Sequence, residues 1–341
     1  MTRHAAMERQ LGLVALVAVL TALTLFLFSL IDMGEANPFA TPAGAQVSLL
    51  QDAIPPTLTC NAVANYTNSA SINLDAVDDG SVASISYRLD GAAVVTVTVD
   101  SVGFLITTEG THTLSGWATD DEGNSSQQQT WAFTVWRTTK LSFSRSEAYP
   151  SYGKRVRLTA VLRRTTDNTG IRGRRVYFQR WTGSAWTTVG SDVTNSSGIA
   201  TMTTMPYQYA KTTYRARFAT SRPFKASSSA SAVVKPHAWV SVPIANSDVL
   251  LASTASIYGK LKPRHPMRTY PVRVYLWRYE SGGWHGYGYK PAMCHDLLTY
   301  SSYTSYFKFA KRGTWRLRAY HPADALHASD WSNGYEYVRV H

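Results

Sequence analysis

The chain carries the stretch Gly313-Thr-Trp-Arg-Leu-Arg-Ala-Tyr320, and two variants of it lie earlier in the sequence. Thr213-Tyr-Arg-Ala-Arg-Phe-Ala219 repeats the pattern about 100 residues before, and Thr111-His-Thr-Leu-Ser-Gly-Trp117 is a weaker copy about 100 residues before that. In each copy, side chains of two different kinds alternate after a small polar turn. This period of two residues is typical of a β-strand. A strand pattern that recurs at this interval predicts one β-sheet domain used three times.

Length and composition fit such a chain. It has 341 residues, of which 44% are hydrophobic, and it contains 20 tyrosines and 10 tryptophans. Aromatic and β-branched residues favour strands, and no long amphipathic helical pattern follows residue 54. We therefore expect an all-β protein whose domains lie at 55–137, 138–235 and 236–341.

Further strands align between the second and third predicted domains, in the same order. Val176-Tyr-Phe-Gln-Arg-Trp181 matches Val274-Tyr-Leu-Trp-Arg-Tyr279, and a glycine turn with a tryptophan (Trp186 or Trp284) follows each. Alternating apolar residues also precede both segments. Several antiparallel strands per domain, joined by short turns, predict a sandwich of two sheets.

Segments of all three predicted domains resemble bacterial immunoglobulin-like domains of exported surface proteins. In the first domain the likeness lies in Pro55-Pro-Thr-Leu-Thr-Cys60, Tyr87-Arg-Leu-Asp-Gly91, Gly110-Thr-His-Thr-Leu114 and Asp121-Glu-Gly-Asn124. In the second it runs from the turn Asn195-Ser-Ser-Gly198 to Tyr214. The third is similar to a divergent relative in actinobacterial surface proteins, through Leu261-Lys-Pro-Arg264, Trp315-Arg-Leu-Arg-Ala-Tyr320 and His321-Pro-Ala-Asp324. The resemblance implies tandem immunoglobulin-like β-sandwich domains that serve as structural or binding modules without catalysis.

An uncharged run from Leu11 to Ile31 follows Arg3 and Arg9. As a helix it is about 31 Å long, enough to cross the hydrocarbon core of a bilayer. Basic residues before the run and acidic residues after it place the N-terminus in the cytoplasm and the rest of the chain outside. The run is therefore expected to be a signal-anchor transmembrane helix, so that a membrane is one partner of the chain through residues 11–31.

A cleaved signal peptide is the alternative for this segment. Small residues that suit cleavage follow at Gly34-Glu-Ala36 and at Ala43-Gly-Ala45. Residues 1–36 are thus a signal peptide or an anchor, and residues 37–54 are a Pro/Ala/Gly linker. Both interpretations export the remainder, either held on the membrane with an extracellular C-terminus or released and associated with the cell wall.

The net charge of +12 is unevenly distributed. Residues 1–54 carry −2 and residues 55–137 carry −7, whereas residues 138–235 carry +14 and residues 236–341 carry +7. The cationic surface therefore belongs to the last two predicted domains, and an anionic polymer is the partner that such a surface favours.

The sequence shows no arrangement of residues that is typical of a catalytic site. Cys294, His295 and Asp296 are adjacent, but neighbouring residues on an extended chain point to opposite faces and would not form a nucleophile–base pair. Cys60 and Cys294 are expected to be isolated thiols. We expect neither an enzyme nor a cofactor.

Metal-ligand spacing is also absent from the histidine pattern. The nine histidines show no H-x-x-x-H or H-E-x-x-H spacing, and His265 and His321, which each precede proline, are expected in loops. No metal site is therefore predicted among them. Clustered carboxylates in acidic turns of the first domain form the one alternative, a calcium site at Asp78, Asp79, Asp120 and Asp121.

One sheet face is the candidate binding surface. In an immunoglobulin-like sandwich, the strands at 274–279 and 314–320 lie side by side. Their outward residues would then be Tyr275, Trp277 and Tyr279 beside Arg316 and Arg318. The second domain offers the same arrangement with Tyr177, Trp181, Arg215 and Arg217. Aromatic rings stack on sugars and guanidinium groups bind anions, but arginine stems also simply cover aromatic residues or form a domain interface.

These features predict a non-enzymatic, exported cell-surface protein that mediates adhesion or binds anionic cell-wall or glycan polymers through this face. One alternative is a purely structural stalk or spacer of a surface assembly, in which other surface proteins are the partners. Another is an extracellular polyanion binder, although the chain has no recognition helix or RNA-binding motif that would specify a nucleic acid.

Overall fold

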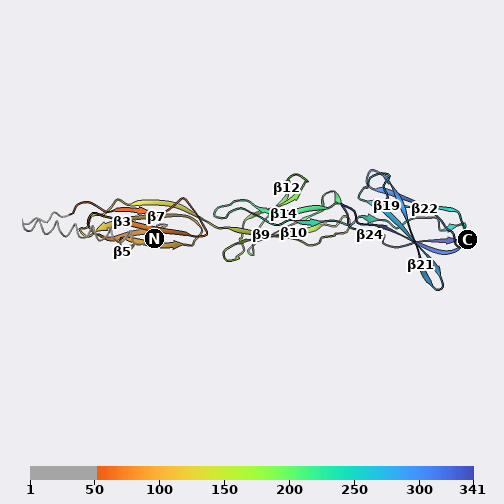
Figure 1. The fold of residues 1–341 in the computed structure, drawn as a ribbon, viewed down its shortest axis with the longest axis horizontal. Helices are drawn as coiled ribbons and strands as arrows, with labels where there is room; N and C mark the ends of the chain where they lie inside the picture. Colours follow the sequence, from red (N-terminus) through yellow and green to blue (C-terminus); the bar gives the residue numbers. More distant parts are fainter. Residues whose placement is uncertain (1–51) are drawn as a thin grey trace, which may run out of the picture. The chain divides into compact units, whose positions relative to one another are not determined.

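The computed structural model describes residues 52–341, and this part of the chain folds almost wholly into β-strands. Figure 1 draws these residues as strand arrows, coloured from orange after residue 51 to blue at the C-terminus. The helical structure of residues 52–341 is limited to one 3₁₀ turn, Tyr207–Tyr209, and they contain no helix long and apolar enough to cross a membrane. The predicted anchor or signal peptide, and nearly all of the linker, lie outside the described residues.

The first strand group spans residues 57–136 and forms two sheets. Its strands are β1 (Thr57–Cys60), β2 (Asn65–Thr67), β3 (Ala70–Val77), β4 (Val82–Leu89), β5 (Val95–Val97), β6 (Ser101–Ile106), β7 (Gly110–Asp120) and β8 (Gln129–Trp136). One sheet has the order β1-β3-β6 and the other β2-β8-β7-β4-β5. Leu58 and Leu74 from the first sheet and Leu114 and Phe133 from the second belong to one buried cluster, so the two sheets enclose a core. This is the strand arrangement of an immunoglobulin-like sandwich.

The second strand group spans residues 139–234 and repeats the arrangement. Its strands are β9 (Thr139–Arg145), β10 (Val156–Arg164), β11 (Arg175–Trp181), β12 (Trp186–Val193), β13 (Ile199–Thr204), β14 (Thr212–Phe218), β15 (Ser227–Ser228) and β16 (Ala232–Val234). The sheets have the orders β13-β10-β9 and β12-β11-β14-β15, and β16 also pairs with β14. Leu158 from one sheet and Phe178 and Phe218 from the other are fully buried in a second, separate cluster.

The third strand group spans residues 239–340 and departs from the predicted pair of separate sheets. Its strands are β17 (Trp239–Val240), β18 (Asp248–Val249), β19 (Thr254–Lys262), β20 (Val272–Glu280), β21 (Gly283–Asp296), β22 (Ser301–Lys308), β23 (Gly313–His321), β24 (Asp330–Trp331) and β25 (Glu336–Val340). Hydrogen bonding runs through one sheet of order β17-β19-β22-β21-β20-β23-β25-β18. The physical reason is the length of β21, which pairs with β20 through residues 283–292 and with β22 through residues 293–296. The strand therefore closes one edge of the sandwich, and no edge is left unpaired there.

The three copies of the repeated stretch occupy the same place in each group. They form β7, β14 and β23, which pair with β4, β11 and β20 respectively. The predicted inward residues are buried in every copy, with Leu114, Tyr214 and Trp315 each at most 2% exposed. The prediction that one strand pattern marks a repeated β-fold is confirmed at this strand, whereas the exact domain boundaries remain a prediction.

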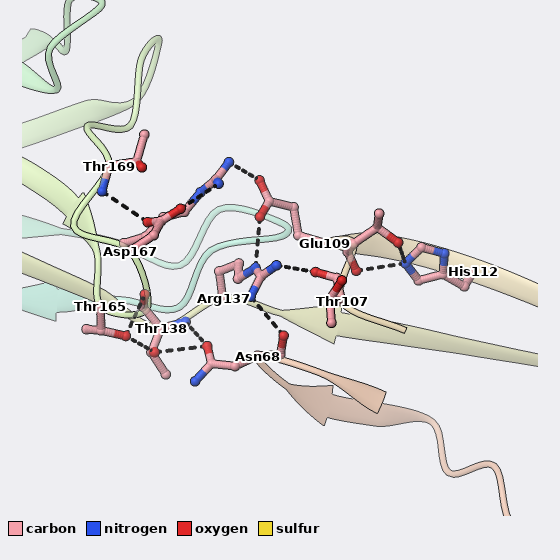
Figure 2. Close-up of polar contacts among 11 residues, drawn as sticks. Asn68, Thr107, Glu109, His112, Arg137, Thr138, Thr165, Asp167 and Thr169 are labelled. Atoms are coloured by element: carbon pink, nitrogen blue, oxygen red, sulfur yellow. Dashed lines mark hydrogen bonds and ion pairs between the residues drawn. The ribbon is translucent and has the colours of Figure 1, made fainter. Parts of the chain in front are cut away.

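Polar contacts connect the first and second groups around Arg137, in the short segment between β8 and β9. Arg137 donates from Nε to Glu109 Oε2 at 2.9 Å and from Nη1 to the carbonyl oxygen of Asn68 at 2.8 Å (Figure 2). The other oxygen of Glu109 accepts a hydrogen bond of 2.6 Å from Arg164 on β10. Glu109 therefore pairs with two arginines, one between β8 and β9 and one on β10, and this segment is braced by side chains as well as by its short length.

Candidate functional site

The two strands that carry the predicted binding residues of the third group are hydrogen-bonded neighbours. In the register of β20 and β23, Tyr275 lies opposite Arg318 and Trp277 lies opposite Arg316. The alternate residues, Val274 and Leu276 on β20 and Trp315 and Leu317 on β23, are buried on the other face. The predicted adjacency and the predicted direction of these side chains are therefore confirmed, because period-2 alternation fixes which residues share a face.

Arg316 lies among three aromatic rings. Its guanidinium carbon is 5.4 Å from the ring centre of Trp277, 4.5 Å from that of Trp284 and 4.4 Å from that of Tyr335. Each such contact contributes about 0.5–1 kcal/mol when exposed and more when desolvated. Its Nε is buried without a hydrogen-bond partner among residues 52–341. The rings fix the position of the charge without neutralising it.

Arg318 is held beside it in a similar way. Its guanidinium carbon lies 5.2 Å from the ring centres of both Trp331 and Tyr335, and its Nε donates to the carbonyl oxygen of Ser332 at 3.0 Å. Within residues 52–341, no ion pair involves Arg316 or Arg318. Two preorganised guanidinium groups without carboxylate partners are suited to bind an anion.

A continuous set of aromatic rings surrounds these arginines. Tyr275 lies 6.0 Å from Trp277, 5.2 Å from Tyr289 and 5.0 Å from Trp331 between ring centres, and Tyr279 lies 5.3 Å from Trp284. Several of these rings are partly open to solvent: Tyr279 is 48% exposed and Tyr289 is 45% exposed. We call this surface the Arg/aromatic face, and it consists of Tyr275, Trp277, Tyr279, Trp284, Tyr289, Arg316, Arg318, Tyr320, Trp331, Tyr335 and Tyr337.

The second group has a smaller version of this surface. Tyr177 lies opposite Arg217 in the pairing of β11 with β14. Arg215 donates from Nε to Gln179 at 2.9 Å and lies 4.2 Å from the ring centre of Trp186, which in turn packs against Trp181 at 5.4 Å. Partial burial lowers the pKa of Arg215, and Arg217 beside it acts in the same direction. Two adjacent like charges in a partly desolvated position are favourable for an anionic ligand.

Several residues of the Arg/aromatic face were not predicted from the sequence. Trp284 of this face, like Trp186 of the second group, follows a glycine turn in the sequence. That position indicated that the two domains are repeats, but it did not indicate that either tryptophan lies beside the arginines. Trp331 and Tyr335 lie in and after β24, a strand of two residues, which leaves no alternation to detect. The aromatic surface is thus larger than strand periodicity alone indicates.

The predicted acidic turns come together only in part. Asp78 and Asp120 lie close enough to share a cation, and the third member of that cluster is Asp52, whereas Asp79 and Asp121 do not belong to it. Burial acts to raise the pKa of Asp120, but hydrogen bonds from Asn124 outweigh it and lower the pKa. These bonds are the ordinary stabilisation of an acidic turn, but Asp52 Oδ2 and Asp78 Oδ1 are buried without a hydrogen-bond partner among residues 52–341, and the calcium alternative stays a prediction.

Four residues of the third group form a cluster that the sequence did not predict. His265, His321, Asp324 and His327 place one potential ligand atom each within 4.8 Å of the others. The expectation that His321 lies in a loop is wrong, because it is the last residue of β23 and is fully buried, and His265 is buried although it follows β19 in a loop. The sequence did not reveal this cluster because the spacing of His321, Asp324 and His327 matches no common metal motif, and the fourth residue, His265, lies 56 positions before His321.

Burial sets the protonation of the cluster. It lowers the pKa of His321 to about 4, and repulsion from His265 acts in the same direction. Burial acts to raise the pKa of Asp324, but hydrogen bonds from His327 and from the backbone N–H of Leu326 hold it at about 2. At neutral pH the cluster therefore contains a neutral His321 beside an ionised Asp324.

The two cysteines are free thiols, as predicted. Cys294 is fully buried, and burial, followed by the charge of Asp296, raises its pKa to about 12. A thiol that stays protonated at neutral pH is not a nucleophile. His295 points away from it, since it is exposed on the opposite side of β21.

Comparison with known proteins identifies no family. No family model matches the chain, and no curated protein matches it. Among solved structures, the ICAM-5 D1–D4 ectodomain fragment aligns at 11% identity over 84% of this chain and 77% of that one, with a TM-score of 0.44. The Escherichia coli adhesin FdeC aligns at 13% identity over 85% and 98%, with a TM-score of 0.28, and the Yersinia pseudotuberculosis adhesin InvE aligns at 16% over 53% and 58%, with a TM-score of 0.32. These similarities are too distant to assign a function, and the immunoglobulin-like character of the chain stands on its own strand order.

Proposed function

We propose that the chain is an exported cell-surface protein without catalytic activity, built from three tandem immunoglobulin-like sandwiches, and that it binds an anionic cell-wall or glycan polymer through the Arg/aromatic face. The observation that carries this proposal is the pair Arg316 and Arg318, held between aromatic rings and without a carboxylate partner among residues 52–341. Arginine has a planar fork that binds phosphate or carboxylate through two parallel hydrogen bonds.

The aromatic rings supply the second part of the recognition. A wall polymer or glycan repeats a sugar or polyol with an anionic group, and exposed Tyr279 and Tyr337 lie on the same face as the arginines. Rings stack on the apolar faces of sugars, while charge-assisted hydrogen bonds hold the anion. Rings and guanidinium groups alternate on this face, which suits a repeating ligand better than a single small anion.

The distribution of charge supports a polymer as the ligand. Residues 138–235 and 236–341 carry +14 and +7, and each contains a strand pair with two outward arginines. Two sites on one chain raise the effective concentration of the second site once the first is occupied, so modest single sites give firm attachment. Export through residues 1–36, either as an anchor or as a cleaved signal, would place both sites where wall polymers occur.

The test is co-sedimentation of the purified full chain with isolated cell walls, before and after chemical removal of their anionic polymers. We expect binding to intact walls at about 0.01 M salt and its loss near 1 M, where the Debye length falls to about 3 Å. Walls stripped of anionic polymer should bind little at any salt. No binding to intact walls at low salt would contradict the proposal and favour a purely structural stalk, and equal binding to nucleic acid of the same charge density would favour a general polyanion binder.

A further inference from the structure

The cluster of His265, His321, Asp324 and His327 has the dimensions of a tetrahedral metal site. His265 Nε2 lies 3.1 Å from His321 Nε2, and Asp324 Oδ2 lies 3.3 Å from His265 Nε2 and 3.5 Å from His321 Nε2. His327 Nδ1 lies 3.2 Å from Asp324 Oδ2. Ligands at about 2.0–2.1 Å around Zn²⁺ are separated by about 3.3 Å along the edges of a tetrahedron. The four separations given above lie close to that value, and the other two edges, from His327 Nδ1 to the Nε2 atoms of His265 and His321, are no longer than 4.8 Å.

A hydrogen bond outside the cluster orients one of the imidazole rings. His265 Nδ1 lies 2.8 Å from the carbonyl oxygen of Pro263, so Nδ1 carries the proton and the lone pair of Nε2 points to the centre of the cluster. Metal-binding histidines commonly donate their other ring N–H in this way. Lys235 donates to the backbone oxygen of Asp324 at 2.6 Å and leaves Oδ2 to the histidines.

Hydrogen bonding within the cluster leaves some of its ring nitrogens without partners. His321 Nδ1 and His327 Nε2 are buried and have no hydrogen-bond partner among residues 52–341. Three imidazoles packed around one carboxylate also place more ring nitrogens together than a single oxygen can pair with. A cation would relieve the crowding of His265 Nε2, His321 Nε2 and His327 Nδ1 around Asp324 Oδ2, whereas the two unpartnered nitrogens are the other nitrogens of their rings and would not be ligands.

The loop that supplies two of these residues also contacts the second strand group. Residues 322–329, between β23 and β24, form this loop. The amide of Lys211 in the second group donates to the carbonyl oxygen of Leu326 at 2.8 Å, and the amide of Ala328 donates to that of Pro236, in the segment between β16 and β17, at 2.9 Å. A cavity of about 640 Å³ next to the cluster is lined by residues of both groups, including Tyr152, Tyr209, His265 and His327, and gives an ion a route to the site.

We propose that His265 Nε2, His321 Nε2, Asp324 Oδ2 and His327 Nδ1 bind one Zn²⁺ ion, and that this ion fastens the 322–329 loop to the turn at 263–265. Imidazole and carboxylate ligands in a tetrahedral arrangement suit Zn²⁺ better than Ca²⁺ or Mg²⁺, which take six or more oxygen ligands. Four protein ligands leave no open position, so the site is structural and not catalytic. Because the fastened loop carries contacts to the second group, the bound ion orders the junction between the second and third groups. The proposal is independent of the Arg/aromatic face.

The test is a calorimetric titration of the metal-free full chain with Zn²⁺. We expect one Zn²⁺ per chain, no comparable binding of Ca²⁺, and a tetrahedral visible spectrum when Co²⁺ is used instead. Asp324→Asn preserves the size of the side chain and the oxygen that accepts the amides of Leu326 and His327, and it should bind Zn²⁺ at least about 100-fold more weakly, since even outer partners of metal ligands cost about 10–100-fold. Asp330→Asn and His295→Ala, outside the cluster, should bind as the unmodified chain does.

Two results would overturn the proposal. Absence of stoichiometric Zn²⁺ binding to the unmodified folded chain rejects the site without recourse to any variant. Equal Zn²⁺ binding by Asp324→Asn and Asp330→Asn places the ion elsewhere. Hydrogen exchange measures separately whether the ion orders the junction between the second and third groups. Zn²⁺ should slow exchange of the amides of Lys211 and Ala328 several-fold. Unchanged exchange at both amides would overturn the role of the ion in fastening the loop.

Discussion

Replacing Trp315 by alanine is expected to lower the free energy of unfolding of the third strand group by about 3–5 kcal/mol, the usual cost of truncating a buried large aromatic residue. Trp315 is 1% exposed and packs on the rings of Tyr287, Phe307 and Phe309, at 4.7, 5.8 and 5.2 Å between ring centres. Its indole N–H also donates to the carbonyl oxygen of Lys311 at 3.1 Å, and truncation leaves that oxygen without this donor.

The measurement is differential scanning calorimetry of the full chain. A loss of this size should lower one melting transition by about 15 °C or more, because about 1 kcal/mol shifts a domain of this size by about 4–8 °C. The transitions of the other two groups should stay in place, since their buried clusters are separate. Trp239→Ala, at a 40% exposed tryptophan of the same group, is the matched control and should shift the transition far less. A shift of all transitions together would contradict three independent cores.

Reversing the charge of both arginines on the Arg/aromatic face of the third strand group is expected to abolish polymer binding. Charge-assisted hydrogen bonds contribute about 1.5–3 kcal/mol each, and about 1.4 kcal/mol is a factor of ten. Arg316→Glu with Arg318→Glu should therefore weaken binding of a soluble anionic wall polymer by at least about 100-fold, with added repulsion between like charges. The measurement is the affinity of the full chain at fixed low salt.

Two further double variants separate this effect from a change of total charge or of fold. Arg155→Glu with Arg157→Glu makes the same change of charge at exposed positions just before and within β10, and should weaken binding by less than about tenfold. Arg316→Lys with Arg318→Lys keeps the charge but loses the fork, and should fall between the unmodified chain and the glutamate variant. If the glutamate variant binds as the unmodified chain does while remaining folded, the face is structural.

The fold was largely predictable because it rests on local alternation. Period-2 patterns identified β7, β14 and β23, and the order of matching strands identified their neighbours β11 and β20. The continuous sheet of the third group was not predictable, since nothing local distinguishes a strand that changes partners midway, as β21 does. The reason for the glycine at position 259 was not predictable either. Gly259 is an inward position of β19, where a Cβ would overlap the ring of Tyr303. Only the fold shows that a residue 44 positions later occupies that space.

The binding face was predictable where strands carry it and unpredictable where loops do. Tyr275, Trp277, Arg316 and Arg318 follow from alternation together with the pairing expected of an immunoglobulin-like sandwich. Three other rings of the Arg/aromatic face contact the arginines: Trp284, Trp331 and Tyr335. The first follows a hairpin turn, and the other two lie in and after the two-residue strand β24. Their positions depend on tertiary packing, which sequence spacing does not encode.

The histidine cluster lay beyond sequence reasoning for a related cause. Three of the four residues, His321, Asp324 and His327, lie at and just after the end of β23, but their spacing matches no common metal motif, and the fourth, His265, follows β19. Only the arrangement of β19 and β23 within one sandwich brings them together. Proline after His321 marks the end of β23, and His265 lies in the loop after β19 as expected, but neither proline indicated that these two histidines are buried.

The most direct test of the proposed binding face is a titration of the ¹⁵N-labelled full chain with a short soluble fragment of an anionic wall polymer, followed by the indole N–H signals of its 10 tryptophans. We expect progressive shifts for Trp277, Trp284 and Trp331, and smaller ones for Trp181 and Trp186, because these rings surround the paired arginines. Buried Trp315 and Trp136 of the first group should not shift. Shifts confined to tryptophans outside the Arg/aromatic face, or none at saturating polymer, would contradict it.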